Sequence, residues 1–170
     1  YNYFLFTQAP KTIEMFNPLI IASEKDYNAE LKQHSLKIEI TFENFKLHHP
    51  EIYENNGAVK IMFPQEARLR HFTYSSNSTV DMNIRYRVRT GDKLEHEQVF
   101  YKTIMDVQLG KFPIMIQSKA CMLNTHAYIS PNKHGECIHD PGGYFIINGS
   151  EKTIISQERA AENKIYVFNI

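Results

Sequence analysis

The sequence has no tryptophan, only two cysteines and no excess of charge of either sign. Its 170 residues include 19 basic and 19 acidic side chains, so the formal net charge is zero. A domain that binds nucleic acid alone usually has a basic excess, so we expect any such contact to be local or shared with other chains. Two cysteines cannot form a disulfide framework, which favours an intracellular protein. No apolar run reaches the length of a membrane span and no secretory signal opens the sequence, so we expect no membrane partner.

The sequence also lacks the patterns of a catalytic centre. Gly142 and Gly143 do not belong to a phosphate-binding loop, because that loop needs a later Gly-Lys followed by Ser or Thr. The aspartates are scattered and form no closely spaced set that could hold Mg²⁺; they include Asp81, Asp92, Asp106 and Asp140. We therefore expect neither catalytic residues nor a bound cofactor in this chain.

A histidine-rich stretch between Ser118 and Asp140 contains both cysteines and raises the question of zinc. Its sulfur and nitrogen groups belong to Cys121, His126, His134, Cys137 and His139. Structural zinc sites usually take ligands in pairs two to four residues apart, and neither cysteine has a second cysteine nearby. The spacing disfavours a metal site, and an exposed loop is the preferred interpretation.

Alternation of apolar and polar residues predicts an antiparallel sheet. Leu36–Leu47 and Thr79–Arg89 both have the period of two that is typical of half-buried strands. Turn residues at Thr90–Lys93 allow Leu94–Met105 to return as the partner strand. Gly110–Ile116 is predicted as a further apolar strand.

The polar face of the Thr79–Arg89 strand carries Arg85, Arg87 and Arg89. Two interpretations are open for this row of arginines. It could bind phosphate groups, or it could pair with Glu95 and Glu97 on the returning strand. The paired surface is the favoured interpretation.

The remaining segments predict short helices and connections. Within Phe4–Ile21, apolar residues such as Ile13 and Phe16 can line one face of a short helix that Pro18 limits. Glu51–Gly57 is predicted as a polar loop and Ala58–Phe63 as a short strand. Pro64–Arg70 is predicted as one or two helical turns with Pro64 in the first turn, and Arg68 is a candidate for a structural ion pair. The whole pattern predicts an α+β fold with antiparallel hairpins or a mixed sheet and a few short helices.

A β-hairpin is predicted near the end of the sequence. Tyr144–Ile147 has the composition of a buried strand, and Thr153–Ile155 is predicted as its partner. Asn148 and Gly149 between them form the dipeptide that a tight hairpin turn prefers, because both positions require positive φ. Glu151 and Lys152 would then lie beside the tip of a rigid finger with an apolar root.

Three blocks of the sequence carry a resemblance to a known family. They are FPQEARLRHFTYS at Phe63–Ser75, FPIMIQSK at Phe112–Lys119, and the hairpin block Asp140–Arg159. In this order they resemble the second-largest subunit of multisubunit DNA-dependent RNA polymerases, in its eukaryotic, archaeal and large-DNA-virus form. The resemblance extends over nearly the whole chain. It implies that residues 1–170 are the first part of the protrusion, an α+β domain on one side of the DNA cleft, and a section of a longer subunit.

The resemblance also implies a set of contacts. Lys152 matches a basic position near the backbone of the RNA–DNA hybrid, Gln157 a polar position near the RNA, and Arg159 belongs to the same motif. Bacterial relatives have arginine where this chain has Lys152, so a point-charge phosphate contact is expected rather than a bidentate one.

The partners that the resemblance implies are the largest subunit, smaller polymerase subunits, template DNA, the RNA–DNA hybrid and initiation factors. The active-site Mg²⁺ would be held by other polypeptide. The location would be the nucleus or, for a viral protein, the cytoplasm or virion. The alternative hypothesis is a stand-alone protein-interaction module that uses the same fold.

Overall fold

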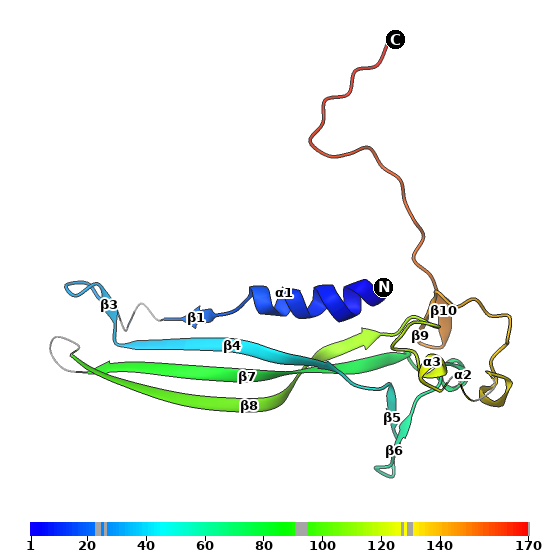
Figure 1. Ribbon diagram of the computed structural model, residues 1–170, viewed down its shortest axis with the longest axis horizontal. Helices are drawn as coiled ribbons and strands as arrows, with labels where there is room; N and C mark the ends of the chain where they lie inside the picture. Colours follow the sequence, from blue (N-terminus) through cyan, green and yellow to red (C-terminus); the bar gives the residue numbers. More distant parts are fainter. Residues whose placement is uncertain (23–24, 26, 91–94, 127, 129–130, 170) are drawn as a thin grey trace.

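The computed structural model describes every residue except 23, 24, 26, 91–94, 127, 129, 130 and 170. It consists of a long antiparallel sheet, here called the arm, and a small packed region at one end of it, here called the head (Figure 1). The arm has the strand order β1-β4-β7-β8, formed by β1 (Leu19–Ile21), β4 (Leu36–Leu47), β7 (Ser75–Thr90) and β8 (His96–Pro113). The predicted α+β fold with antiparallel pairing is confirmed.

The two strands predicted from alternation are both present. β4 has the predicted bounds, and β7 extends the predicted strand at both of its ends. At about 3.3 Å per residue, the 16 residues of β7 span roughly 50 Å. This length explains why the arm reaches far beyond the head.

Three predictions around β8 have different outcomes. A separate strand at Gly110–Ile116 is wrong, because β8 continues to Pro113 with Ser75–Ser78 of β7 as its partners. Pairing of Glu95 is also wrong, since Glu95 precedes β8, is exposed, and has no ion pair with any described residue. The predicted turn falls largely on residues 91–94, which lie outside the described residues.

Cross-strand ion pairs hold the row of arginines on β7. Glu97 of β8 lies 3.4 Å from Arg87 and 3.1 Å from Arg89, so its predicted pairing is confirmed. Glu39 of β4 lies 3.5 Å from Arg85 and 3.4 Å from Arg87 on the other side of the strand. The pattern of the sequence did not indicate Glu39, because β4 does not belong to the β7–β8 hairpin that supplies the predicted partners of the arginines.

Asp81 lies where the pairing of the central strand β7 is irregular on both sides. The register of β7 with each neighbouring strand shifts close to this residue. Its carboxylate accepts hydrogen bonds from the backbone N–H of Asp106 at 3.0 Å and from the side chain of Asn44 at 2.9 Å. These two bonds, with the one from Asp106 first, hold the pKa of Asp81 below its usual value. Asp81 is therefore a structural residue that fixes two bulges.

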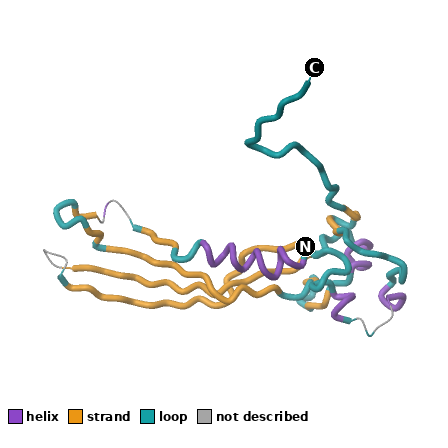
Figure 2. The backbone as a smooth tube through the Cα atoms, turned by 45° about the horizontal axis from the view of Figure 1, so that its top comes forward, coloured by secondary structure: helices purple, strands orange, loops and turns teal. Residues whose placement is uncertain are grey.

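The amino-terminal segment forms a helix that ends before a short edge strand. The helix comprises η1 (Phe4–Gln8) and α1 (Ala9–Met15), and Figure 2 shows it beside the sheet. The predicted short helix is confirmed as far as Met15, whereas the end of the segment Phe4–Ile21 forms β1. Asn17, which lies between the helix and β1, is bonded to β4. Its amide group donates to the carbonyl of Phe42 at 2.7 Å and accepts from the Phe42 N–H at 2.8 Å.

Short elements form the hairpin at the far end of the arm and the frame of the head. The first is β2–β3 (Tyr27–Asn28 and Gln33–His34); the head contains β5–β6 (Glu51–Tyr53 and Val59–Ile61), α2 (Pro64–Leu69), α3 (Met122–Thr125), η3 (Pro131–His134) and β9–β10 (Phe145–Ile147 and Ser150–Lys152). α2 and the β6 strand are confirmed. The predicted loop at Glu51–Gly57 is wrong in its first three residues, which form β5. Among the described residues, no helix is long and apolar enough to cross a membrane.

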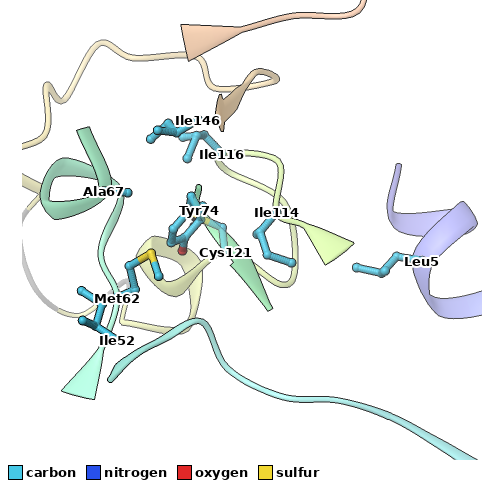
Figure 3. Close-up of a cluster of buried hydrophobic side chains, with 9 residues drawn as sticks. All are labelled: Leu5, Ile52, Met62, Ala67, Tyr74, Ile114, Ile116, Cys121 and Ile146. Atoms are coloured by element: carbon cyan, nitrogen blue, oxygen red, sulfur yellow. Dashed lines mark hydrogen bonds between the residues drawn. The ribbon is translucent and has the colours of Figure 1, made fainter. Parts of the chain in front are cut away.

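The hydrophobic core lies in the head and not under the arm. Its buried members come from η1, β5, α2, β9 and the segments that connect the elements: Leu5, Ile52, Met62, Ala67, Tyr74, Ile114, Ile116, Cys121 and Ile146. Figure 3 shows Tyr74 in the middle of this cluster, with Ile146 on one side and Met62 on the other. Tyr74 is fully buried, and its hydroxyl oxygen accepts a hydrogen bond from the Met122 N–H at 3.0 Å. The core therefore joins segments that are far apart in the chain.

Replacing Tyr74 with phenylalanine is expected to loosen α3 without emptying the core. The ring volume stays, but the buried Met122 N–H loses its acceptor, which costs about 1–3 kcal/mol. Hydrogen exchange measured by mass spectrometry should show faster exchange in the peptide 121–126. Tyr3→Phe is the control, since Tyr3 is 64% exposed, and equal exchange in the two variants would contradict the role assigned to the hydroxyl.

Candidate nucleic-acid interface

The turn of the β9–β10 hairpin has the predicted geometry. Asn148 has φ +50° and Gly149 has φ +78°, which places both residues in the left-handed region that a two-residue hairpin turn requires. Ser150 pairs with Ile147, and Lys152 pairs with Phe145. The Asn-Gly turn and the strand before it are thus confirmed.

The second strand of the hairpin is not where the sequence predicts it. It is Ser150–Lys152, whereas Thr153–Ile155 lies outside any strand. With a two-residue turn, the partners of residues 154 and 155 would be Gly143 and Gly142. Both glycines have positive φ, so β9 cannot extend backwards to meet them. The prediction is wrong because it ignored this break at the start of β9.

The hairpin packs along the segment that follows α2 and does not project as a free finger. The Gly149 N–H donates to the carbonyl of Phe72 at 2.9 Å. The Asn148 N–H donates to Oγ1 of Thr73 at 3.2 Å, and the Tyr74 N–H donates to the carbonyl of Ile146 at 2.9 Å. These bonds fix both the tip and the root of the hairpin.

Arg68 of α2 joins the hairpin to the loop before it. Its Nε lies 2.8 Å from Glu151 of β10, and its Nη1 lies 2.8 Å from Glu136. Its Nη2 donates to the hydroxyl of Tyr144 at 2.7 Å. The side chains of Arg68 and Glu136 are only 18% and 5% exposed. The structural ion pair predicted for Arg68 is confirmed.

The surroundings of this network shift the pKa of its members. Burial alone would lower the pKa of Arg68, but the hydrogen bonds and charge of Glu136 outweigh it and raise that pKa above its usual value. Burial, together with the hydrogen bond to Asp140, raises the pKa of Tyr144. Arg68 is therefore charged and Tyr144 neutral at every ordinary pH.

A second ion-pair cluster lies between the end of α2 and the β5–β6 hairpin. Glu66 on α2 and Arg70, which caps the helix, pair with Lys60 and Glu54 of that hairpin. Hydrogen bonds from Arg70 and Lys60 lower the pKa of Glu54 to about 2. α2 therefore contacts the β5–β6 hairpin through this surface cluster and β10 through Arg68.

Lys152 lies on the outer face of this fixed hairpin. Residues directly opposite each other in a ladder share a face, so Lys152 is on the side of Phe145 and Glu151 on the side of the buried Ile146. Phe145 itself is in contact with the ring of Tyr1, whose centroid is 5.6 Å away. Lys152 is exposed and has no ion pair with any residue that the structure describes. Its charge is therefore available to a partner.

Gln157 and Arg159 are not brought together with Lys152. They lie in the segment after β10, in which residues 153–169 contain no helix or strand and are all exposed. Figure 1 shows this segment leaving the hairpin and running away from the head. Arg159 forms an ion pair with Glu162 within the segment. The geometry therefore supports Lys152 more strongly than the other two predicted residues.

The stretch before the hairpin is more than an exposed loop, so that interpretation is wrong in part. Cys121 and Glu136 are buried, and His134 stacks on Phe63 with ring centroids 4.2 Å apart. Cys137 is exposed. Within the described part of the chain, no group of three or more His, Cys, Asp or Glu side chains is placed to hold a metal ion. The stretch instead covers the core and supplies Glu136 to Arg68.

Sequence reasoning missed the residues that position the hairpin. Glu136 lies in a polar stretch and Tyr144 at the edge of an apolar run, and neither pattern indicates a contact with α2. The only signal was Arg68 itself, an arginine late in a short helix.

Comparison with known proteins is consistent with these features. The family described as RNA polymerase beta subunit matches residues 1–163. The chain is 42% identical over 159 residues to DNA-directed RNA polymerase II subunit RPB2 of the yeast Meyerozyma guilliermondii, a match that covers 88% of the chain and 13% of that protein. It is 37% identical to the probable RPB2 homolog of Invertebrate iridescent virus 6, over 86% of the chain and 12% of that protein.

An archaeal relative is similar to the same degree. Subunit Rpo2N of the DNA-directed RNA polymerase of Halobacterium salinarum is 40% identical over 116 residues, or 68% of the chain and 21% of that protein. The chain thus spans about an eighth to a fifth of the length of these three relatives.

Proposed function

Because the chain belongs to the RNA polymerase beta-subunit family, in its second-largest-subunit form, we propose that residues 1–170 are the first part of the protrusion domain of such a subunit. In this role the chain forms one side of the cleft of a DNA-directed RNA polymerase. It helps to hold DNA and the RNA–DNA hybrid during transcription. The observation that carries the proposal is an exposed Lys152, with no ion pair among the described residues, on a hairpin whose opposite face is fixed by Arg68.

The chemistry of nucleotide transfer is assigned to other polypeptide. Such polymerases use Mg²⁺ to polarise the triphosphate. The carboxylates that the structure describes do not converge on a metal site, and the best-placed ones are already bound to cations, such as Glu136 to Arg68. In this proposal the chain contributes position and charge to the reaction, and other polypeptide chains supply the catalytic groups.

The partners in this proposal are the largest subunit, smaller polymerase subunits, template DNA, the RNA–DNA hybrid and initiation factors. Gln157 and Arg159 lie in the extended segment and remain proposed nucleic-acid contacts that such a partner would order. The protein would act in the nucleus or, if viral, in the cytoplasm or virion.

Replacing Lys152 with alanine in the assembled polymerase tests the proposal. If Lys152 neutralises one phosphate, its loss should weaken nucleic-acid binding about equally for all sequences. It should also reduce the slope of log affinity against log salt concentration by about one. Binding of a template–transcript scaffold, measured by fluorescence anisotropy at several salt concentrations, gives this slope.

Lys11→Ala is the matched control, because Lys11 is also exposed but lies on α1. An unchanged slope for Lys152→Ala would remove Lys152 from the interface. If the chain instead fails to co-purify with a largest polymerase subunit, the stand-alone interaction module would replace the proposed function.

A further inference from the structure

The polar face of the arm has more positive than negative charge at the end far from the head. Glu39 is shared by three cations, Lys37 at 3.0 Å, Arg85 and Arg87. Glu97 is shared by Arg87 and Arg89. Four cations therefore share two carboxylates, and most of the arginine contacts are 3.4–3.5 Å long. Pairing within the sheet leaves part of this positive charge unbalanced.

A hollow of about 230 Å³ lies at this place between the β2–β3 hairpin and the arm. The described residues that line it include no carboxylate; they are Lys32, Gln33, His34, Lys37, Arg87 and Arg89. Arg89 is held in position by a 2.8 Å hydrogen bond from its Nη1 to the side chain of Gln33. A concave surface that is lined by positive charges attracts anionic ligands.

An exposed aromatic ring lies next to the arginine row on the same face. Tyr101 of β8 is directly opposite Arg85 in the ladder and is 74% exposed. The guanidinium carbon of Arg85 is 5.8 Å from the centre of the tyrosine ring. A second hollow of about 340 Å³ lies beside this pair and is also lined by Thr41, Asn83 and Thr103, and by Glu39, whose charge is shared by three cations. The ring and the polar side chains around it are open to a planar ligand.

We propose that this face of the arm binds a single-stranded nucleic acid. Lys37, Arg87 and Arg89 would hold its phosphates, and a base would stack on Tyr101. Alternate residues of a strand are roughly 7 Å apart, so β7 presents its arginines as a regular row beside the ring. Sites for single strands combine such a cationic track with an aromatic side chain. An acidic peptide would use the arginines but leave the tyrosine without a role.

This surface is distinct from the interface around Lys152. The inference drawn from it does not depend on the role proposed for Lys152. β9 and β10 are in the head, whereas the row Arg85–Arg89 approaches the opposite end of the arm (Figures 1 and 2). A single strand bound here would therefore be a second contact, far from the first.

Photo-crosslinking in the assembled polymerase tests the inference. The probe is a ten-nucleotide strand of 4-thiothymidine, and the crosslinked tryptic peptides are identified by mass spectrometry. Crosslinking is expected in peptide 94–102, which contains Tyr101. The Arg87→Gln variant should lower this yield and reduce the slope of log affinity against log salt concentration by about 0.7, the value for one phosphate of a single strand, whereas Lys11→Gln should change neither.

A matched pair of variants on β8 separates stacking from a general effect on the sheet. Tyr101→Ala should weaken competition by the unlabelled strand roughly 5- to 150-fold, the range for one stacked base. Phe100→Ala should not, because Phe100 is 54% exposed on the opposite face. The proposal would be overturned if the crosslink were absent or if the two variants had equal effects. It would also be overturned if a polyglutamate peptide competed equally well, and that result would indicate an acidic protein segment as the ligand.

Discussion

Replacing Gly149 with valine is expected to open the β9–β10 hairpin of the assembled subunit. Gly149 has φ +78°, a conformation that side chains with a Cβ rarely adopt. A Cβ at this position would also lie 2.8 Å from the Cα of His71 and 3.0 Å from the carbonyl oxygen of Arg68. His71 belongs to the segment on which the hairpin packs and Arg68 to α2 just before it, so the turn cannot relax in place.

The size of the effect follows from these two causes. A left-handed conformation costs a residue with a Cβ about 1–2 kcal/mol, and forcing extra atoms into a packed site costs about 1–3 kcal/mol more. The sum of roughly 2–5 kcal/mol should speed hydrogen exchange in peptide 144–152 by about 30-fold or more. Because Lys152 is on β10, nucleic-acid binding should also lose the contribution of that lysine.

Gly143→Val separates the two causes. Gly143 has φ +85°, but no atom of the described residues lies within 4 Å of a Cβ placed there. It should therefore show the conformational cost alone. If Gly149→Val speeds exchange no more than Gly143→Val does, the close packing of the turn against His71 is contradicted.

The hairpin illustrates which features the sequence could predict. The turn at Asn148 and Gly149 depends on two adjacent residues, so local chemistry is sufficient to find it. The packing of Gly149 against His71 joins positions far apart in the chain, and no local pattern carries that information. The second strand was misplaced for a related reason: its length is set by the glycines before β9, not by the apolar residues after the turn.

The arm gives the same contrast. Long alternating stretches predict the bounds of β4 and the part of β7 from Thr79 to Arg89, because a half-buried strand needs that period. Glu97 was predicted as a partner of the arginines because it lies on the next strand of the same hairpin. Glu39 was missed because the topology that places β4 beside β7 depends on the whole fold. The core around Tyr74 depends on the fold in the same way.

The second large effect is expected for Arg68→Met. Methionine keeps much of the apolar volume but removes the partner of Glu136, which is only 5% exposed. An unpaired buried carboxylate is costly, so the change should destabilise the head by roughly 2–4 kcal/mol. Hydrogen exchange should rise together in peptides 64–74, 131–140 and 144–152, because Arg68 joins all three segments.

Two further variants make this prediction specific to the buried network. Arg70→Met changes the neighbouring arginine of the same helix, which is 38% exposed and pairs with Glu54 and Glu66 at the surface. Surface pairs contribute little, so exchange should change only slightly. Arg68→Met combined with Glu136→Gln removes the unpaired charge and should recover at least half of the loss. If Arg68→Met behaves like Arg70→Met, or if the double variant recovers nothing, Arg68 does not fix the hairpin that presents Lys152.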